Sequence, residues 1–240
     1  MTRPQSMNAP AFLPASSFSL NCVAAADDWD AVRAVRYVSL LERGDIADDS
    51  PPRFGDAHDD RPYAMTLLLR RNGRPAATAR VMESTPPRHS PLPAAGAFAH
   101  EIEAALGIDA SFVEMDMTHV GPGCGDEART ARFHLFKGVL AQASLRRSKW
   151  VLTAVCEDQI GFHGRLFGMQ ILSGPEAVAG LALPRVLMGL DLQEQRPILE
   201  RRIPGLATHR AALEAFVATG HLSLDDPMGM PLTARHLQPG

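Results

Sequence analysis

The sequence predicts a mixed α/β protein whose central sheet is mostly antiparallel and carries helices on both faces. Three observations indicate this class. Two apolar runs flank Asn72-Gly73, the strongest short signal for a β-hairpin. Residues 149–155 form a near-continuous apolar run, as expected of a strand buried on both faces. Helical patterns at 128–147 and 157–168 alternate with strand-like segments, which favours β-loop-α-β units.

The first part of the chain predicts a strand, a helix and a hairpin. Residues 18–26 have strand character, and 27–46 have apolar side chains at helical spacing. A polar, proline-rich loop separates this helix from the hairpin expected over 63–82.

An insertion at about 83–110 follows the hairpin. Its first part, 83–98, carries four prolines, so long regular structure is not expected there, and a short helix is expected at 99–107. Residues 111–120 then alternate as a strand does. The alternation places Val113, Met115 and Met117 on one face and Glu114, Asp116 and Thr118 on the other.

The remaining segments complete the predicted sheet. After the helix at 128–147, the strand at 149–155 and the helix at 157–168, two more strands are expected, the second at 183–192, and a terminal helix at 208–219. We expect about six or seven strands, with a splay between 112–121 and 149–155.

Composition excludes several classes of protein. The 240 residues are 45% hydrophobic and 21% charged, which is ordinary for a globular protein. A net charge of −3 argues against a general nucleic-acid binder, and no run approaches the length of a membrane span. Three widely spaced cysteines without a metal-ligand pattern favour reduced thiols, a cytoplasmic location and no metal site.

The segment after 111–120 suggests an anion site. Gly121, Gly123 and Gly125 lie between a strand and a helix, where bare backbone and the helix dipole favour a phosphate. A plain connecting turn is the alternative, and Asp126 and Glu127 would repel a phosphate close by.

Basic residues follow this turn without any acid between residues 128 and 156. They favour an acidic partner, either a nucleotide diphosphate or an acidic carrier protein, with a solvated helix face as the alternative. The six are Arg129, Arg132, Lys137, Arg146, Arg147 and Lys149.

The order of elements over 18–192 resembles the GNAT acyltransferase fold. The stretch "THVGPG" (118–123) is similar to the glycine half of the signature with which that family holds the coenzyme A pyrophosphate, with Thr118 where the family has Gln or Arg. The resemblance implies that the thioester donor contacts Thr118, Val120, Gly121, Gly123, Gly125 and Arg129.

A second resemblance is to the acyl-homoserine-lactone (autoinducer) synthases and bacterial N-acyl amino acid synthases. It rests on six residues in the order and spacing of that pattern: Arg33, Tyr37, Asp56, Asp59, Arg80 and Glu114. It implies that Glu114 is the catalytic base and that the other five bind substrate. Met117 stands where the autoinducer synthases have Arg, and no Trp follows the first helix. A broader N-acyl amino acid synthase or an uncharacterised acyltransferase therefore fits better than lactone production.

The residues themselves leave alternatives open. A partly buried Glu114 suits a general base, but it could instead pair with a neighbouring Arg. Asp56 and Asp59 would orient an amine or pair with Arg33 or Arg36, and an exposed acidic loop is the alternative. Arg80 would hold a substrate carboxylate or pair with Asp59. His119 and His163 are alternative bases, and a surface or capping role is the other interpretation of each.

The resemblance also implies the organisation and activity of the chain. We expect a flexible arm at 1–17, a GNAT-like domain at 18–195 and an extension with a short helix at 196–240. The expected activity is transfer of a fatty acyl group to the amine of an amino acid or related small molecule. The donor would be acyl-coenzyme A or an acyl carrier protein, with no permanently bound cofactor. A carrier would dock through Arg132, Lys137, Arg146, Arg147 and Lys149.

Two other functions remain open from the sequence. One is a short-chain acetyltransferase that depends on coenzyme A. The other is a catalytically silent domain that binds acyl-thioesters or a partner protein.

Overall fold

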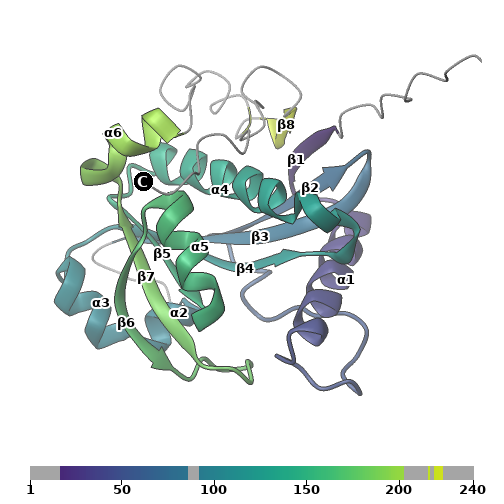
Figure 1. Cartoon of the computed structure of the whole chain (residues 1–240), viewed down its shortest axis with the longest axis horizontal. Coiled ribbons are helices and arrows are strands. Elements are labelled where there is room, and N and C mark those ends of the chain that lie inside the picture. The colour runs from purple at the N-terminus through teal and green to yellow at the C-terminus, as the bar shows by residue number, and fades with distance from the viewer. Residues whose placement is uncertain (1–16, 86–91, 203–215, 217–218, 224–240) are drawn as a thin grey trace, which may run out of the picture.

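The computed structural model describes residues 17–85, 92–202, 216 and 219–223. Its strands form one sheet in the order β6-β7-β5-β4-β3-β2-β1-β8 (Figure 1). The strands are β1 (Phe18–Cys22), β2 (Ala64–Arg71), β3 (Arg74–Ser84), β4 (Phe112–Val120), β5 (Trp150–Val155), β6 (Gln170–Glu176), β7 (Arg185–Asp191) and β8 (His221–Ser223). The helices are α1 (Ala26–Glu42), α2 (Pro93–Ala97), α3 (Ala99–Leu106), the 3₁₀ segment η1 (Pro122–Glu127), α4 (Ala128–Leu145), α5 (Glu157–Phe167) and α6 (Leu192–Arg202).

The sheet splays open between its two central strands. β4 and β5 are the one parallel pair among the described strands, and their pairing ends at Glu114 and Leu152. Beyond that point β3 and β4 run across the molecule while β5 and β7 run down it, as Figure 1 shows. The mixed, mostly antiparallel sheet and the splay confirm the prediction, with eight strands in place of six or seven.

A β-bulge lies in β4 beside the splay. Thr78 pairs with His119 and Arg80 with Asp116, so β4 contains one more residue than β3 over this interval. Met117 lies in the bulge with φ 45°, a conformation that side chains other than glycine seldom adopt. The bulge changes the direction of β4 where it separates from β5.

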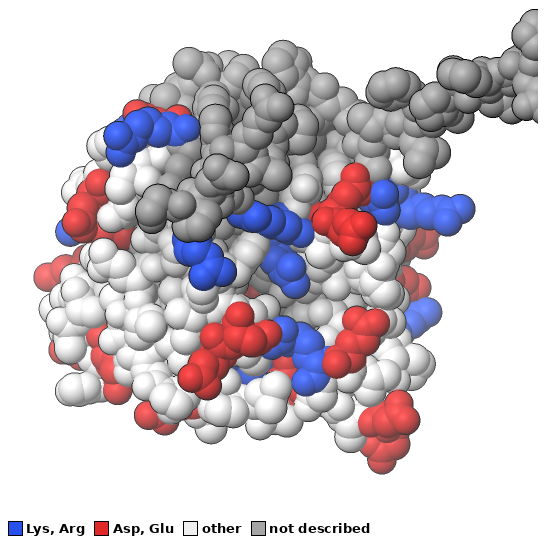
Figure 2. All heavy atoms as spheres, viewed as in Figure 1, with Lys and Arg blue, Asp and Glu red and all other residues white. Residues whose placement is uncertain are grey.

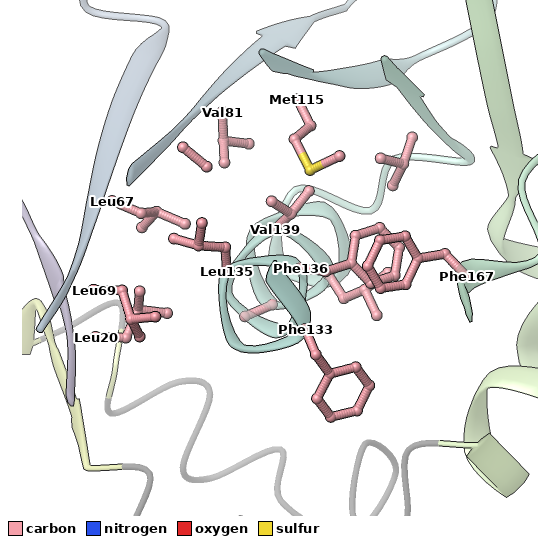
Figure 3. Close-up of a cluster of buried hydrophobic side chains, with 14 of the residues drawn as sticks. Leu20, Leu67, Leu69, Val81, Met115, Phe133, Leu135, Phe136, Val139 and Phe167 are labelled. Atoms are coloured by element: carbon pink, nitrogen blue, oxygen red, sulfur yellow. The ribbon is translucent and has the colours of Figure 1, made fainter. Parts of the chain in front are cut away.

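Helix α4 packs on one face of the sheet together with α5. Figure 3 shows Leu135, Phe136 and Val139 of α4 among side chains from β1, β2, β3 and β4. Phe136 stacks on Phe167 of α5 with ring centroids 3.6 Å apart. This face is therefore the main hydrophobic core.

Helices α1, α2 and α3 cover the opposite face. The second cluster joins Met82 and Leu152 of the sheet to Phe98 and Ile102 of the insertion. The sequence did not predict α2, α6 or β8. The expected helix at 208–219 and the arm at 1–17 lie almost entirely outside the described residues. Within the described part of the chain, no helix is long and apolar enough to cross a membrane.

A glycine sets how closely α4 approaches the sheet. A Cβ at Gly138 would lie 2.7 Å from Leu20 Cδ2 and 2.9 Å from Leu67 Cδ1, and both leucines are fully buried. Bare backbone at this position therefore allows the close contact of helix and sheet.

We expect Gly138→Ala to destabilise the protein, because overpacking a core costs roughly 1–3 kcal/mol. The helix propensity of Ala, worth about 1 kcal/mol over Gly, offsets only part of this cost. Gly96→Ala in α2 is the matched control, since a Cβ there would meet nothing within 4 Å. Denaturant unfolding measures the free energy of unfolding of both variants. Equal stability of the two variants would contradict the close packing.

Candidate active site

Arg80 is the centre of a buried ion network. Its side chain is fully buried, and all five N–H donors are used. Nε and Nη2 donate to Asp116 at 2.9 and 2.6 Å. Nη1 and Nη2 donate to Asp56, and Nη1 also donates to Asp59 at 3.0 Å. A guanidinium in this state has no donor left for a substrate carboxylate, so the structure favours pairing with Asp59.

Arg36 on α1 extends the network. Its Nη1 donates to both oxygens of Asp59, at 2.9 and 2.7 Å, and its side chain is fully buried. Burial alone would raise the pKa of Asp56, but the hydrogen bond and charge of Arg80 outweigh it and hold that pKa below its usual value. The network therefore joins α1, the loop before β2, and the strands β3 and β4.

Glu114 lies beside this network with only 1% of its surface exposed. Its carboxylate accepts hydrogen bonds from the backbone N–H groups of Ala94 at 2.8 Å and Ala95 at 3.3 Å, at the start of α2. Burial raises the pKa of Glu114 to about 8, and the charge of Asp116 adds to this increase. The backbone bonds and Arg80 oppose the shift. The group is therefore poised to exchange a proton near neutral pH.

Asp116 is a member of the site that the sequence did not single out. Only its place on the same strand face as Glu114 pointed to it. Burial raises its pKa, although Arg80 opposes the shift. Three aspartates share two buried guanidinium groups here, so the region has excess negative charge and disfavours ionisation of Glu114.

A cavity of about 340 Å³ occupies the gap between the splayed strands. One side of the lining is acidic. It consists of Asp56 and Asp116 of the ion network and of Glu114 beside it. The opposite wall comes from β5, from α4 and α5, and from the loop between β6 and β7. The cavity thus connects an acidic end with a second wall that carries Arg132 and His163.

The other predicted substrate residues lie near the network but do not line the cavity. Arg33 on α1 places its guanidinium 5.7 Å from the Trp29 ring centroid, and its Nε lies close to Gly55. Tyr37 is half-buried one turn further along α1. The structure brings Asp56, Asp59, Arg80 and Glu114 together and leaves these two at the side.

The glycine turn is folded more tightly than the sequence suggested. Its residues form η1, and the N–H of Gly121 donates to the carbonyl of Ala76 at 2.8 Å, so that N–H is not available to a phosphate in this structure. Arg71 donates to the carbonyl of Gly123 at 2.9 Å. Gly125 has φ 48° and ψ −127°, which favours glycine.

Two of the other predicted donor-binding residues line the cavity. These are Thr118 and Val120, whereas Arg129 is exposed and does not line it. The Thr118 hydroxyl is buried and has no hydrogen-bond partner among the described residues. A hydroxyl in that position can donate to a bound thioester.

The basic residues after the turn do not form one surface. Lys137 is only 3% exposed, with Nζ 4.9 Å from the Phe133 ring centroid, and burial lowers its pKa to about 8. Its expected place on a carrier-docking surface is therefore wrong. Arg132 and Arg146 are about 20 Å apart along the axis of α4, at about 1.5 Å per residue. Figure 2 shows both signs of charge interspersed on the face in view.

Arg146, Arg147 and Lys149 are exposed at the far end of α4. Arg146 pairs with Glu83 at 2.7 Å, and Lys149 lies 3.6 Å from Asp191. Among the described residues, no group of three or more His, Cys, Asp or Glu side chains is arranged to hold a metal ion.

A sheet splayed between β4 and β5, with a buried carboxyl beside the gap, defines a GNAT-fold N-acyltransferase. The family model described as N-acyl amino acid synthase FeeM matches residues 31–191. The chain belongs to this family. A comparison of the sequence with curated proteins finds no match.

Solved structures share the fold at low sequence identity. The FeeM N-acyl amino acid synthase from uncultured soil microbes superposes with a TM-score of 0.63 at 17% identity, over 76% of this chain and 95% of that one. The acyl-homoserine-lactone synthase LasI superposes with a TM-score of 0.57 at 10% identity, over 74% of this chain and 90% of that one. The coenzyme-A-dependent acyl-homoserine-lactone synthase BjaI, solved with MTA, superposes with a TM-score of 0.57 at 15% identity, over 77% of this chain and 89% of that one.

The raised pKa of Glu114 makes folding stability depend on pH. The folded protein holds this proton more tightly than the unfolded chain, so stability falls as pH rises from 4.5 to about 8. Glu114→Gln has no proton to lose. We therefore expect the variant to gain stability relative to the wild type over this interval, measured by urea unfolding at several pH values. A difference that stays constant with pH would show that Glu114 has an ordinary pKa.

Proposed function

We propose that the protein transfers a fatty acyl group from an acyl-thioester to the amino group of an amino acid. The observation that carries the proposal is the buried Glu114 carboxyl, with its raised pKa, at the acidic end of the cavity. The description of the family as N-acyl amino acid synthases supports an amino acid as the acceptor.

The acidic end of the cavity suits a cationic amine. An acceptor arrives as an ammonium ion, and the excess charge of Asp56, Asp59 and Asp116 over Arg36 and Arg80 attracts it. Glu114 takes a proton from the ammonium. The neutral amine then attacks the thioester carbonyl, the N–C bond forms, and the C–S bond breaks to release the thiol.

The donor would occupy the gap between β4 and β5. The hydroxyl of Thr118 is available to donate to the thioester or to an amide of its carrier arm. BjaI, which shares the fold, is described in complex with SAM and isopentyl-CoA, which supports acyl-coenzyme A as one donor here. An acyl carrier protein is the other donor, and it presents the same thioester.

Arg33 and Tyr37 lie outside the cavity lining, beside the ion network, and we assign them to the part of the acceptor that extends beyond the cavity. Arg80 has no unused donor, whereas Arg33 forms no ion pair with a described acid. Arg33 could therefore hold the carboxylate of an amino acid beside the network. Asp59 would then act through Arg36 and Arg80, which it positions, and not by touching the acceptor.

We expect Glu114→Gln to lower turnover by roughly 10²–10⁴-fold, the usual contribution of general-base catalysis. Donor affinity should change little, because the variant keeps the size of the side chain. Wild-type turnover should rise with pH up to about 8, the pKa of Glu114, and the variant should lack this inflection. The assay is mass spectrometry of acyl amino acids formed from a panel of amines.

Two outcomes would contradict this role of Glu114. If the variant kept a turnover near that of the wild type, Glu114 would not be the base. A cooperative melt at a much lower temperature would assign the loss to folding, because Glu114 also binds the start of α2.

A carrier protein would dock on the exposed residues at the far end of α4. Reversing charge at Arg146 and Arg147 should weaken use of an acyl carrier protein much more than use of acyl-coenzyme A, since surface charge governs encounter with a charged protein. Arg74→Glu is the control, because Arg74 is exposed at the β2–β3 turn. The measurement is the steady-state rate of each variant with each donor at two salt concentrations. Equal loss with both donors would argue against docking at this surface.

A further inference from the structure

We propose that His163 carries the proton from the attacking nitrogen to the departing sulfur. The inference rests on the proposed function and adds a second catalytic residue to it. Glu114 prepares the amine, whereas His163 would act after attack, on the opposite wall of the cavity.

His163 lies on α5, and its side chain lines the same cavity as Glu114 and Asp116. Glu114 projects from β4 on the face that α2 covers, whereas α5 packs with α4 on the main core. Glu114 and His163 therefore border one cavity from two different elements, so both could reach a reacting centre that lies between them.

The imidazole of His163 has one defined hydrogen bond. Nδ1 lies 3.0 Å from the backbone carbonyl of Gln159, and a carbonyl can only accept, so Nδ1 carries the hydrogen. Nε2 of the neutral ring then bears a lone pair. The structure gives Nε2 no hydrogen-bond partner among the described residues.

Aromatic neighbours hold this ring in place. Phe162 and Phe167 meet it edge to face, with centroids 5.4 and 5.7 Å away, and only 3% of the residue is exposed. A ring fixed in this way keeps Nε2 in one position without the need for a second hydrogen bond. Fixed geometry of this kind is what a proton carrier requires.

Three histidines line the cavity, His58, His119 and His163, and the surrounding charge distinguishes His163 from His119. His119 is buried in the field of Arg36, Arg43, Arg185 and Arg80, and burial with these cations lowers its pKa to about 3. Burial lowers the pKa of His163 too, but Arg132 is the one cation that adds to the shift, and the bond to Gln159 opposes it. His163 is thus neutral at rest and the better of the two to hold a proton briefly.

The step balances in atoms and charge. Attack forms the N–C bond and leaves one surplus proton on nitrogen in the tetrahedral intermediate. Nε2 of His163 accepts that proton, the C–S bond breaks, and the proton moves from Nε2 to sulfur. The products are an amide, a neutral thiol and the neutral imidazole. The proton that Glu114 removed from the ammonium returns separately to solvent.

Two thioesters with the same acyl chain test this step. One carries the chain on pantetheine, an alkyl thiol that needs a proton to leave well. The other carries it on thiophenol, a much stronger acid that leaves as the thiolate. We expect His163→Gln to lower turnover of the alkyl thioester by roughly 10²–10³-fold, within the range of acid–base catalysis, and to change the aryl thioester little.

His134→Gln is the matched control. His134 is also buried, beside Phe18 and Phe133, and its pKa is lowered to about 4, but it does not line the cavity. Melting curves of both variants show whether each folds. The control should retain the wild-type ratio of the two rates.

The outcomes separate the two hypotheses. Wild-type protein that makes no amide from either thioester would overturn the proposed acyl transfer itself. Active wild type with an equal loss on both thioesters in His163→Gln, or no loss on either, would overturn the proton relay alone. Loss confined to the alkyl thioester supports it, and a folding defect cannot produce that pattern because it would affect both donors.

Discussion

The whole site depends on one buried guanidinium. Arg80 donates five hydrogen bonds to three aspartates that come from a loop and from β4. Burying these charges is costly, and the acceptors that all five donors of Arg80 find offset this cost. Removing Arg80 would leave Asp116 without its ion-pair partner. The network fixes the loop before β2 against the sheet and, through Arg36, fixes α1 as well.

The same network determines the proton affinity of Glu114. Two cations do not balance three aspartates, so a fourth negative charge is disfavoured, and burial acts in the same direction. The carboxyl is stabilised in part by the backbone N–H groups of α2. The insertion that carries α2 is therefore coupled to the site. Its apolar side chains Leu92, Phe98 and Ile102 pack on the sheet and hold the helix start over Glu114.

The splay provides the space in which these groups can act. Parallel pairing of β4 and β5 stops at Glu114, and the bulge at Met117 turns β4 away from β5. In the autoinducer synthases an Arg stands where this chain has Met117. The cavity wall at this position is therefore apolar here, and the cations of the cavity come from other elements, among them Arg132 of α4.

The sequence by itself determined the order of elements from β1 to β7 except for α2, because hydrophobic periodicity and turn residues are local signals. The six residues of the family pattern came from the resemblance to the synthases and not from periodicity. Alternation along β4 also placed Glu114 and Asp116 on one face. The tertiary structure alone decided that Asp116 shares Arg80 with Asp56 and Asp59, since these contacts join residues 21 to 36 positions apart in the chain. It also decided that Lys137 is buried and that His163 lines the cavity, because side-chain burial depends on the packing of distant elements and not on the spacing of charges along one helix.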